Sequence, residues 1–378
     1  MKVAGIIAEY NPFHNGHAYQ IQQTRKQATH IIAVMSGHLT QRGSISCYSK
    51  WIRAKAAIQS GVDLVLELPT SFACSSAERF ALGGIGLLGS LGIVDCISFG
   101  SESGDISSLM ECANQCLNIN QSPEMQQLLK QGLSYPAARR RALREKGDLL
   151  DFPNNTLGIE YIKAAKQLGF QFEWLTIQRQ GASHDSEIPT GDFASASYLR
   201  GQTSWENFIP QNCRDIYQPS LRSNPEQLEM VLLYLIRTTT KQQWAELPDV
   251  SEGLENRLYE SGKIATSSEQ FLSIVKTKRY TMSRLRRILS YRFLDIQKAN
   301  LESSPLYGRV LGMNQKGKEL LSKIRTASTI PVSPDFPKLA RQFPKQAALD
   351  SKATDLFYMT TPQIQKAGQD YLQKPIIQ

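Results

Sequence analysis

Short apolar runs alternate with helix-like stretches throughout the first half of the chain. Runs rich in Val, Ile and Leu, most of which end in polar, Gly or Pro residues as buried strands do, cover residues 3–8, 30–36, 63–69, 94–100 and 172–178. Between them lie helical patterns, among them residues 17–27 and 49–60. This alternation predicts a parallel sheet that helices cover on both faces, with right-handed crossovers.

The rest of the chain predicts mostly helix. Residues 104–150 have helical patterns with little strand character, residues 152–170 fit a loop that enters another helix, and residues 193–200 fit a final short helix. Beyond these, strand-like runs vanish and amphipathic stretches with apolar positions at helical spacing dominate. We therefore expect an α/β domain with a Rossmann-like parallel sheet over residues 1–204 and a mainly helical domain over residues 205–378.

Composition places the chain among ordinary globular proteins, with 41% hydrophobic and 20% charged residues in 378. No apolar run reaches the roughly 18–20 residues that span a membrane, and the N-terminus has no signal-peptide core or cleavage site. We expect a cytoplasmic protein without a membrane partner. The six cysteines form no CxxC pair, which indicates reduced thiols. Cys112 and Cys116 have no other Cys or His nearby in sequence, so no metal ligands are expected.

Positive charge is concentrated in the second half of the chain. The formal net charge is +9, but residues 1–200 hold 18 Lys and Arg against 17 Asp and Glu, a balance of +1. Residues 201–378 hold 25 against 17, a balance of +8. The asymmetry indicates a polyanionic partner of the C-terminal part. A basic surface that merely keeps the protein soluble fits the composition equally well.

His14 and His17 are two of only five histidines, and they stand between the first apolar run and the helical stretch that follows it. Residues three apart on a helix share a face, and a helix N-terminus attracts phosphate. Two imidazoles there can donate hydrogen bonds to phosphate oxygens and stabilise charge during nucleotidyl transfer. Gly16 leaves room for a nucleotide. The spacing also fits half of a zinc site, or two surface histidines.

The sequence Asn-Pro-Phe-His-Asn-Gly-His over residues 11–17 resembles the HxGH signature of the nucleotidyltransferase superfamily. That superfamily includes the class I aminoacyl-tRNA synthetases and the small adenylyltransferases of cofactor synthesis. The resemblance implies that His14 and His17 contact the triphosphate of ATP, that pyrophosphate is released, and that Gly16 lies under the adenosine.

A second stretch, ASASYLR over residues 194–200, resembles the ISSTxIR element that touches phosphates in the adenylyltransferases. Ser195, Ser197 and Arg200 match that element, whereas Ala196 and Leu199 depart from it. The alternative is an ordinary helix N-terminus that the first of these serines caps.

Longer blocks narrow the resemblance to one family. The chain is similar over nearly its whole length to the tRNA(Met) cytidine acetate ligases, through residues 5–17, 34–43, 50–58, 63–69, 99–105, 153–161, 276–289 and 307–317. The resemblance implies an enzyme that joins acetate to ATP, which forms acetyl-adenylate and pyrophosphate. The acetyl group then passes to the exocyclic amine of the wobble cytidine of elongator tRNA(Met), which gives 4-N-acetylcytidine.

The same resemblance implies that the catalytic residues are His14 and His17. On the residues alone, Gly100 fits a turn, Asn154 a helix cap and Arg179 a surface charge equally well. The implied ATP-binding residues are Ile7, Ala8, Glu9, Tyr10, Asn11, Pro12, Phe13, His14, Asn15, Gly16, His17, Ala18, Tyr19, Gln20, Gly100, Asn154, Arg179 and Gln180. Magnesium is expected with ATP because it neutralises phosphates, although no carboxylate motif identifies its ligands.

The loop after the second predicted strand has two interpretations. Ser36, Gly37, Gln41 and Arg42 either shape the acetate or cytidine pocket or form a structural loop.

Two further pairs of residues are candidates. Lys50 and Arg53 begin a predicted helix and either reach phosphate or lie on a solvated helix face. His184 and Asp185 are candidates for the proton acceptor of the cytidine amine, because a histidine near its ordinary pKa suits that task.

The span of residues 276–292 concentrates basic side chains around Tyr280 and Tyr291. It predicts contact with an RNA backbone, with stacking by tyrosine, although a solvated basic helix face has the same pattern. The expected tRNA-binding residues are Lys276, Lys278, Arg279, Arg284, Arg286 and Arg287. The basic run over residues 139–146 is a candidate extension of this surface.

Two other functions compete with the ligase. An adenylyltransferase that makes a nucleotide cofactor from ATP and a small phosphorylated acceptor accounts for the first half but not for the basic second half. A tRNA-binding protein with a vestigial nucleotide site accounts for the basic half, but the intact His14, Gly16 and His17 argue against it.

Overall fold

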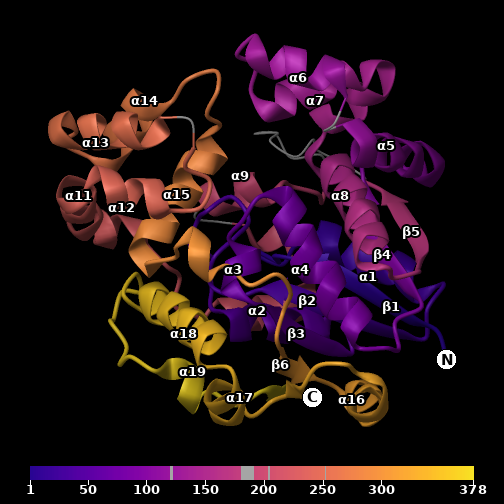
Figure 1. The fold of residues 1–378 in the computed structure, drawn as a ribbon. Coiled ribbons are helices and arrows are strands. Elements are labelled where there is room, and N and C mark those ends of the chain that lie inside the picture. The colour runs from indigo at the N-terminus through magenta and orange to yellow at the C-terminus, as the bar shows by residue number, and fades with distance from the viewer. Residues whose placement is uncertain (120–121, 180–190, 203–204, 252) are drawn as a thin grey trace.

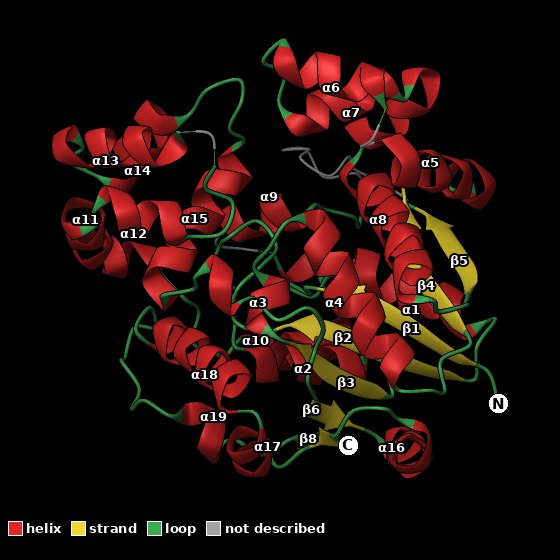
Figure 2. Cartoon of the chain, in the orientation of Figure 1, coloured by secondary structure: helices red, strands yellow, loops and turns green. Residues whose placement is uncertain are grey.

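The computed structural model describes residues 1–119, 122–179, 191–202, 205–251 and 253–378, and these residues form one eight-stranded sheet flanked by helices (Figures 1 and 2). The first five strands follow the apolar runs that predicted them. They are β1 (Val3–Ala8), β2 (His30–Ser36), β3 (Leu64–Leu68), β4 (Cys96–Ser101) and β5 (Glu173–Gln178). The predicted α/β fold class is confirmed.

The strand order β5-β4-β1-β2-β3 fixes where a ligand can bind. β1 pairs in parallel with β2 from Val3–His30 to Ala8–Met35, and it pairs in parallel with β4 on its other side. The order therefore reverses between β1 and β4. In open parallel sheets ligands bind at such a reversal, outside the carboxyl ends of the strands. The segment that carries both histidines leaves the sheet at this point.

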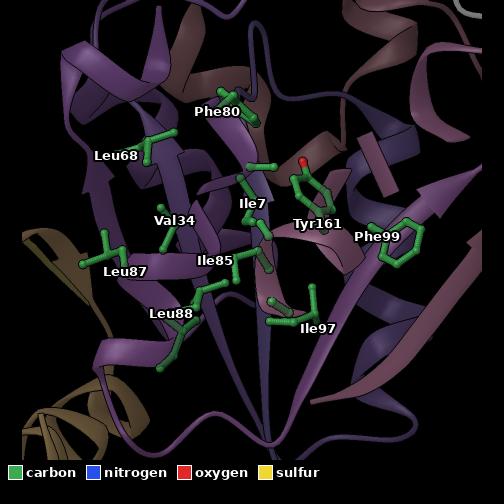
Figure 3. Close-up of a cluster of buried hydrophobic side chains, with 14 of the residues drawn as sticks. Ile7, Val34, Leu68, Phe80, Ile85, Leu87, Leu88, Ile97, Phe99 and Tyr161 are labelled. Atoms are coloured by element: carbon green, nitrogen blue, oxygen red, sulfur yellow. The ribbon is translucent and has the colours of Figure 1, made fainter. Parts of the chain in front are cut away.

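Each face of the sheet is buried by its own set of helices. One face packs on α4 (Ala77–Ser90), α5 (Ile106–Ile119) and α8 (Pro153–Leu168), in a core that includes the side chains labelled in Figure 3. The opposite face packs on α1 (Asn15–Arg25), α2 (Lys50–Gln59) and α10 (Arg214–Tyr217). Neighbouring residues of β1 join different cores, Ile7 the first and Ile6 the second, because side chains alternate along a strand.

Residues 104–150 are helical where described, as predicted. After α5 come α6 (Pro123–Lys130), α7 (Tyr135–Ala142) and a 3₁₀ helix over Arg144–Asp151. α6 and α7 share a small core of their own, which includes Met125 and Ala138, and they project away from the sheet in Figure 1. α8 begins at Pro153, so the predicted loop before it is shorter than expected.

A separate helical part follows α10, as the amphipathic stretches predicted. It contains α11 (Glu229–Thr238), α12 (Lys241–Glu246), α13 (Leu254–Ile264), α14 (Ser268–Val275) and α15 (Met282–Leu294). Trp244, Phe271 and Ile288 lie in a core that is distinct from the two cores of the sheet.

The expectation that strands vanish beyond residue 205 is wrong. β6 (Gly308–Met313) joins the sheet antiparallel to β3, and β7 (Val332–Ser333) and β8 (Ile376–Ile377) pair with β6. The apolar run of β6 is short, has a glycine near each end and carries Arg309, and these features hide its strand character. Around it lie α16 (Gln315–Ala327), α17 (Phe336–Gln342), α18 (Pro344–Tyr358) and α19 (Gln369–Leu372). The sheet therefore draws on both sides of the proposed boundary after residue 204, and that boundary stays a prediction.

No helix in the described ranges combines the length and the apolar character that crossing a membrane requires. All six cysteines are free and buried. A cytoplasmic location stays a prediction.

Candidate active site

His14 and His17 form a hydrogen-bonded pair at the start of α1. His14 is the N-cap of this helix, and its Nδ1 accepts from the Gly16 N–H at 3.0 Å. The His14 N–H in turn donates to His17 Nδ1 at 3.2 Å, and the two rings stack with centroids 3.8 Å apart. Because each Nδ1 accepts a hydrogen bond, a neutral ring carries its proton on Nε2. The pair therefore presents two N–H donors beside a helix N-terminus, which itself attracts anions.

His17 is held in its neutral form. Burial, aided by the nearby His14 and the charge of Arg179, keeps the pKa of His17 well below its usual 6.5. At neutral pH this ring donates a hydrogen bond without adding a full charge. Gly16 has a steric role here, because a Cβ at this position would lie 2.9 Å from His14 Cε1. Its expected place under the adenosine stays a prediction.

The segment between β1 and α1 supports the histidines from behind. Tyr10 and Phe13 are buried, and their rings lie edge-on to each other with centroids 4.9 Å apart. Tyr10 also packs edge-on to His17 at 5.0 Å, and the Phe13 N–H donates to the hydroxyl of Tyr217 at 3.1 Å. Like Ile7, which lies in the sheet core, these side chains face the interior. They can contribute to a nucleotide site only through their backbone.

Residues along α1 divide between exposed and structural positions. The side chain of Asn15 donates to the carbonyls of Asp192 and Asn207, at 2.9 and 3.2 Å. Gln20 donates to the Ser98 carbonyl at 3.2 Å, which ties α1 to β4. Residues 15–20 are all partly exposed, as Ala18 and Tyr19 must be to line a ligand site.

Three of the predicted residues gather at the ends of β4 and β5. The Arg179 N–H donates to the Ser101 carbonyl at 3.0 Å, and a Cβ on Gly100 would lie 3.6 Å from Arg179 Cγ. Asn154 Nδ2 donates to Glu102 at 2.6 Å. The positive charge of Arg179 also contributes to the lowered pKa of His17. Gln180, His184 and Asp185 lie outside the described residues.

Glu102 lies beside these residues and was not among the predicted site residues. Its carboxylate accepts from the backbone N–H groups of Asn154 and Asn155, at 3.3 and 2.9 Å, as well as from the Asn154 side chain. Asn155 Oδ1 accepts in return from the N–H groups of Glu102 and Ser103, at 2.9 and 3.1 Å. An acidic residue within the stretch of residues 99–105 was a visible signal, but its partner lies about fifty residues away.

Both expectations for Arg53 and Lys50 are wrong. Each is fully buried, so neither reaches phosphate and neither lies on a solvated face. Arg53 donates to the carbonyls of Glu9, Ser36 and Tyr48, at 2.6, 3.0 and 3.0 Å, and to that of Gly37. This guanidinium therefore pins the ends of β1 and β2 together.

Lys50 belongs to a buried ionic cluster below the same loops. It pairs with Glu67 at 2.6 Å and with Asp370 at 2.7 Å, and Arg309 pairs with the same two carboxylates. His38 completes the connection, since its Nε2 accepts from the Lys50 N–H at 3.2 Å. The cluster joins the first half of the chain to its C-terminal end.

The loop after β2 is largely structural at its start and partly exposed further on. Ser36 and Gly37 accept from Arg53 through their carbonyls, and a Cβ on Gly37 would lie 2.5 Å from Glu67 Oε1. Gln41 and Arg42 are partly exposed, and the Gln41 N–H donates to Glu9 Oε1 at 2.6 Å.

The stretch of residues 194–200 lies beside the histidine loop. Ser195 caps α9 (Ala196–Gly201) by accepting from the Tyr198 N–H at 3.0 Å, which fits the alternative of an ordinary cap. Arg200 reaches the loop, because its Nη1 donates to the Asn11 carbonyl at 3.2 Å. Ser197 is exposed.

The basic residues of 276–292 do not all face solvent. Arg287 is 7% exposed and pairs with Asp249 at 2.8 Å, so it serves the interior rather than an RNA backbone, contrary to expectation. Arg284 donates to the Asp249 carbonyl at 2.8 Å. Lys276, Lys278 and Arg286 are exposed, and Arg279 is partly exposed.

Most of the basic side chains in the second basic run, residues 139–146, form ion pairs. Arg139 pairs with Glu160, Arg140 with Asp151 and Lys146 with Glu111, at 2.5, 2.5 and 2.6 Å. Arg141 and Arg144 are the exposed arginines of the run without an ion pair among the residues described.

Together, the fold and site define a HIGH-type nucleotidyltransferase. The profile of the family described as HIGH Nucleotidyl Transferase matches residues 1–371. Relatives named tRNA(Met) cytidine acetate ligase, from Thermoanaerobacter sp. (strain X514) and Acetivibrio thermocellus, are each 38% identical to the chain. The first match covers 98% of both chains and the second covers 100% of both.

Solved structures agree with these matches. The crystal structure of Thermotoga maritima TmcAL in its apo form I gives a TM-score of 0.93 at 33% identity, over 100% of this chain and 99% of that one. The same protein bound with alpha-thio ATP gives 0.91 at 32% identity with equal coverage. The chain belongs to the tRNA(Met) cytidine acetate ligase family, and the predicted resemblance is confirmed.

Proposed function

We propose that this protein activates acetate with ATP and transfers the acetyl group to the exocyclic amine of the wobble cytidine of elongator tRNA(Met). The observation that carries the proposal is the stacked pair of His14 and His17 at the N-terminus of α1, in which burial lowers the pKa of His17, in a chain of this family. Donors fixed in this way suit a phosphoryl group that gains charge during substitution.

In the first step an acetate oxygen attacks the α-phosphorus of ATP, and the bond to pyrophosphate breaks. The Nε2–H groups of His14 and His17, with the partial positive charge at the N-terminus of α1, hold the phosphate oxygens. Arg179 neutralises charge on the departing side. In the second step the cytosine amine attacks the acetyl carbon, and AMP leaves. Such chemistry needs positioning and charge stabilisation rather than a nucleophilic side chain.

Magnesium is proposed only as an ion that binds together with ATP. In the part of the chain that is described, no three His, Cys, Asp or Glu side chains gather as a metal site. Mg²⁺ is commonly held by substrate phosphates and water, with one or two carboxylates. No step is assigned to it here.

The tRNA would be held by the exposed cations before and along α15, namely Lys276, Lys278 and Arg286, with Arg279 beside them. Backbone contacts of this kind supply much of the affinity for nucleic acid and weaken with salt.

The test incubates the protein with ATP, labelled acetate and total tRNA, digests the tRNA and measures acetylcytidine by mass spectrometry. The double variant His14→Ala with His17→Ala runs beside the wild type, and His30→Ala, at the start of β2, is the matched control. Labelled acetylcytidine that disappears only in the double variant supports the proposal. Pyrophosphate release with a small phosphorylated acceptor, without label on tRNA, would contradict it and favour the adenylyltransferase.

A further inference from the structure

Glu9 stands where solvent reaches the end of the central strand. The segment from Val3 to His14 is buried except for Ala8 and Glu9, which are partly exposed. These two residues follow directly from β1 and precede the histidine loop. Any group that approaches the carboxyl end of β1 therefore meets the Glu9 side chain.

The Glu9 carboxylate is fixed through one of its two oxygens. Oε1 accepts from the Gln41 N–H at 2.6 Å, and the Glu9 carbonyl accepts from Arg53 at 2.6 Å. Across the described ranges no hydrogen-bond donor is paired with Oε2. One oxygen thus orients the group, and the other is left to receive a donor. A carboxylate held in this way is preorganised for its partner.

The same loop connects Glu9 to the helix with the exposed cations. Gly43, two residues after Gln41, accepts from the Ser290 hydroxyl of α15 at 3.1 Å. A Cβ on Gly43 would lie 2.5 Å from the Arg287 backbone nitrogen, so the loop and the helix are in direct contact. The loop that fixes Glu9 through Gln41 therefore packs directly on the helix that is proposed to hold RNA.

The other titratable groups near Glu9 are poorly suited to accept a proton. Burial raises the pKa of the Cys74 thiol to about 12 and also raises the pKa of Tyr161. In the histidine pair each Nδ1 already accepts a hydrogen bond. Among the described residues near Glu9, its own carboxylate is therefore the better-suited base.

We propose that Glu9 Oε2 receives the exocyclic amine of the acceptor cytosine, orients it toward the acetyl carbon and accepts its proton during transfer. The inference rests on the proposed function. Carboxylates are the side chains that accept from the cytosine N4 amine in nucleic-acid recognition. The nitrogen lone pair forms the new C–N bond, the bond between the acetyl carbon and the AMP oxygen breaks with its electrons on AMP, and one N4 proton moves to Glu9.

The test separates the two half-reactions. Acetate-dependent exchange of pyrophosphate into ATP reports activation, and single-turnover transfer from synthetic acetyl-adenylate to a tRNA(Met) transcript reports acylation. Glu9→Gln keeps an oxygen for the Gln41 N–H but cannot take up a proton. Glu173→Gln, at the start of the edge strand β5 and exposed, is the matched control.

We expect Glu9→Gln to lose about 100-fold or more in transfer, the usual contribution of general base catalysis, and to lose far less in exchange, in which no N4 proton is taken up. Glu9→Asp keeps the carboxylate and should transfer faster than Glu9→Gln. Transfer by Glu9→Gln within threefold of wild type would overturn the inference, as would an equal loss of exchange and transfer or a slower Glu9→Asp. A wild type that shows neither reaction would instead refute the proposed function.

Discussion

Replacing Arg53 by Met removes the donor that holds the ends of β1 and β2 together. Methionine replaces the aliphatic part of the arginine, so the loss is that of the guanidinium and its hydrogen bonds. Four buried backbone carbonyls would lose their partner, those of Glu9, Ser36, Gly37 and Tyr48. Because the first two belong to the neighbouring strand ends, the variant should also displace the loops that carry Glu9 and the histidines.

The size of the effect follows from these contacts. A hydrogen bond to a charged group contributes about 1.5–3 kcal/mol, but bonds that share one side chain are not additive. The charge is itself costly to bury, since burial lowers the pKa of Arg53 to about 10. We therefore expect the free energy of unfolding to fall by about 3–5 kcal/mol, the range for breaking a buried charged contact. For a chain of 378 residues, 3 kcal/mol lowers Tm by about 4 °C.

The assay is urea unfolding followed by far-UV circular dichroism, together with acetate-dependent exchange of pyrophosphate into ATP. Lys55→Met, on the exposed side of the same helix, is the control and should change stability by less than about 0.5 kcal/mol. Exchange by Arg53→Met should fall by at least about tenfold, because small misplacements of reacting groups are costly. A destabilisation below about 1 kcal/mol, or unchanged exchange, would refute the role assigned to Arg53.

Three further predictions concern other parts of the molecule. Burial and the nearby Lys50 lower the pKa of His38 well below 6.5, so the unfolded state takes up the proton first as pH falls. Below about pH 6.5 the unfolding free energy of the wild type should therefore fall with pH more steeply than that of His38→Gln, by about 1.4 kcal/mol per pH unit. Glu102→Gln should raise the KM for ATP by about tenfold, because it loosens the loop of Asn154. Arg286→Ala should weaken tRNA binding and lower its salt slope by about one, whereas Arg287→Ala should destabilise the fold by about 3 kcal/mol.

Each of these has a contrary outcome. Parallel stability curves for wild type and His38→Gln between pH 5.5 and 7.5 would show that this histidine is not held neutral. An unchanged KM for ATP in the Glu102 variant, measured by exchange, would show that the hydrogen bonds between Glu102 and the start of α8 play no part in nucleotide binding. Equal salt slopes for Arg286→Ala and wild type in filter binding would remove that side chain from the RNA surface.

The sequence predicts the sheet well where burial acts alone. β1 to β4 are apolar because both faces of a parallel sheet are covered, so their runs are visible without the structure. The histidine pair is visible for a similar reason, since strand end, turn and helix start follow each other within a few residues. Prediction fails where charges find partners far along the chain. Arg309 hides β6, and only its contacts with Glu67 and Asp370 explain a buried guanidinium in a strand.

The burial of the charged side chains at the start of α2 was also not predicted. Lys50 and Arg53 give its first turn the pattern of a solvated face, yet both lie in the interior. Their partners come from strand ends and from the C-terminal end of the chain, more than three hundred residues away for Asp370. Local patterns cannot indicate such pairs. The hydrogen bonds between Glu102 and the start of α8 were not predicted for the same reason, since the two partners lie far apart in the sequence.

The central claim is that acetate is activated as acetyl-adenylate at the histidine pair. The most direct measurement supplies acetate labelled with ¹⁸O in its carboxylate, together with ATP and tRNA, and analyses AMP by mass spectrometry. An acetate oxygen that attacks the α-phosphorus stays on the nucleotide when the acetyl group leaves. We predict one ¹⁸O atom in AMP for each acetylcytidine formed, and neither product with His14→Ala and His17→Ala. Acetylcytidine formed without ¹⁸O in AMP would contradict the account.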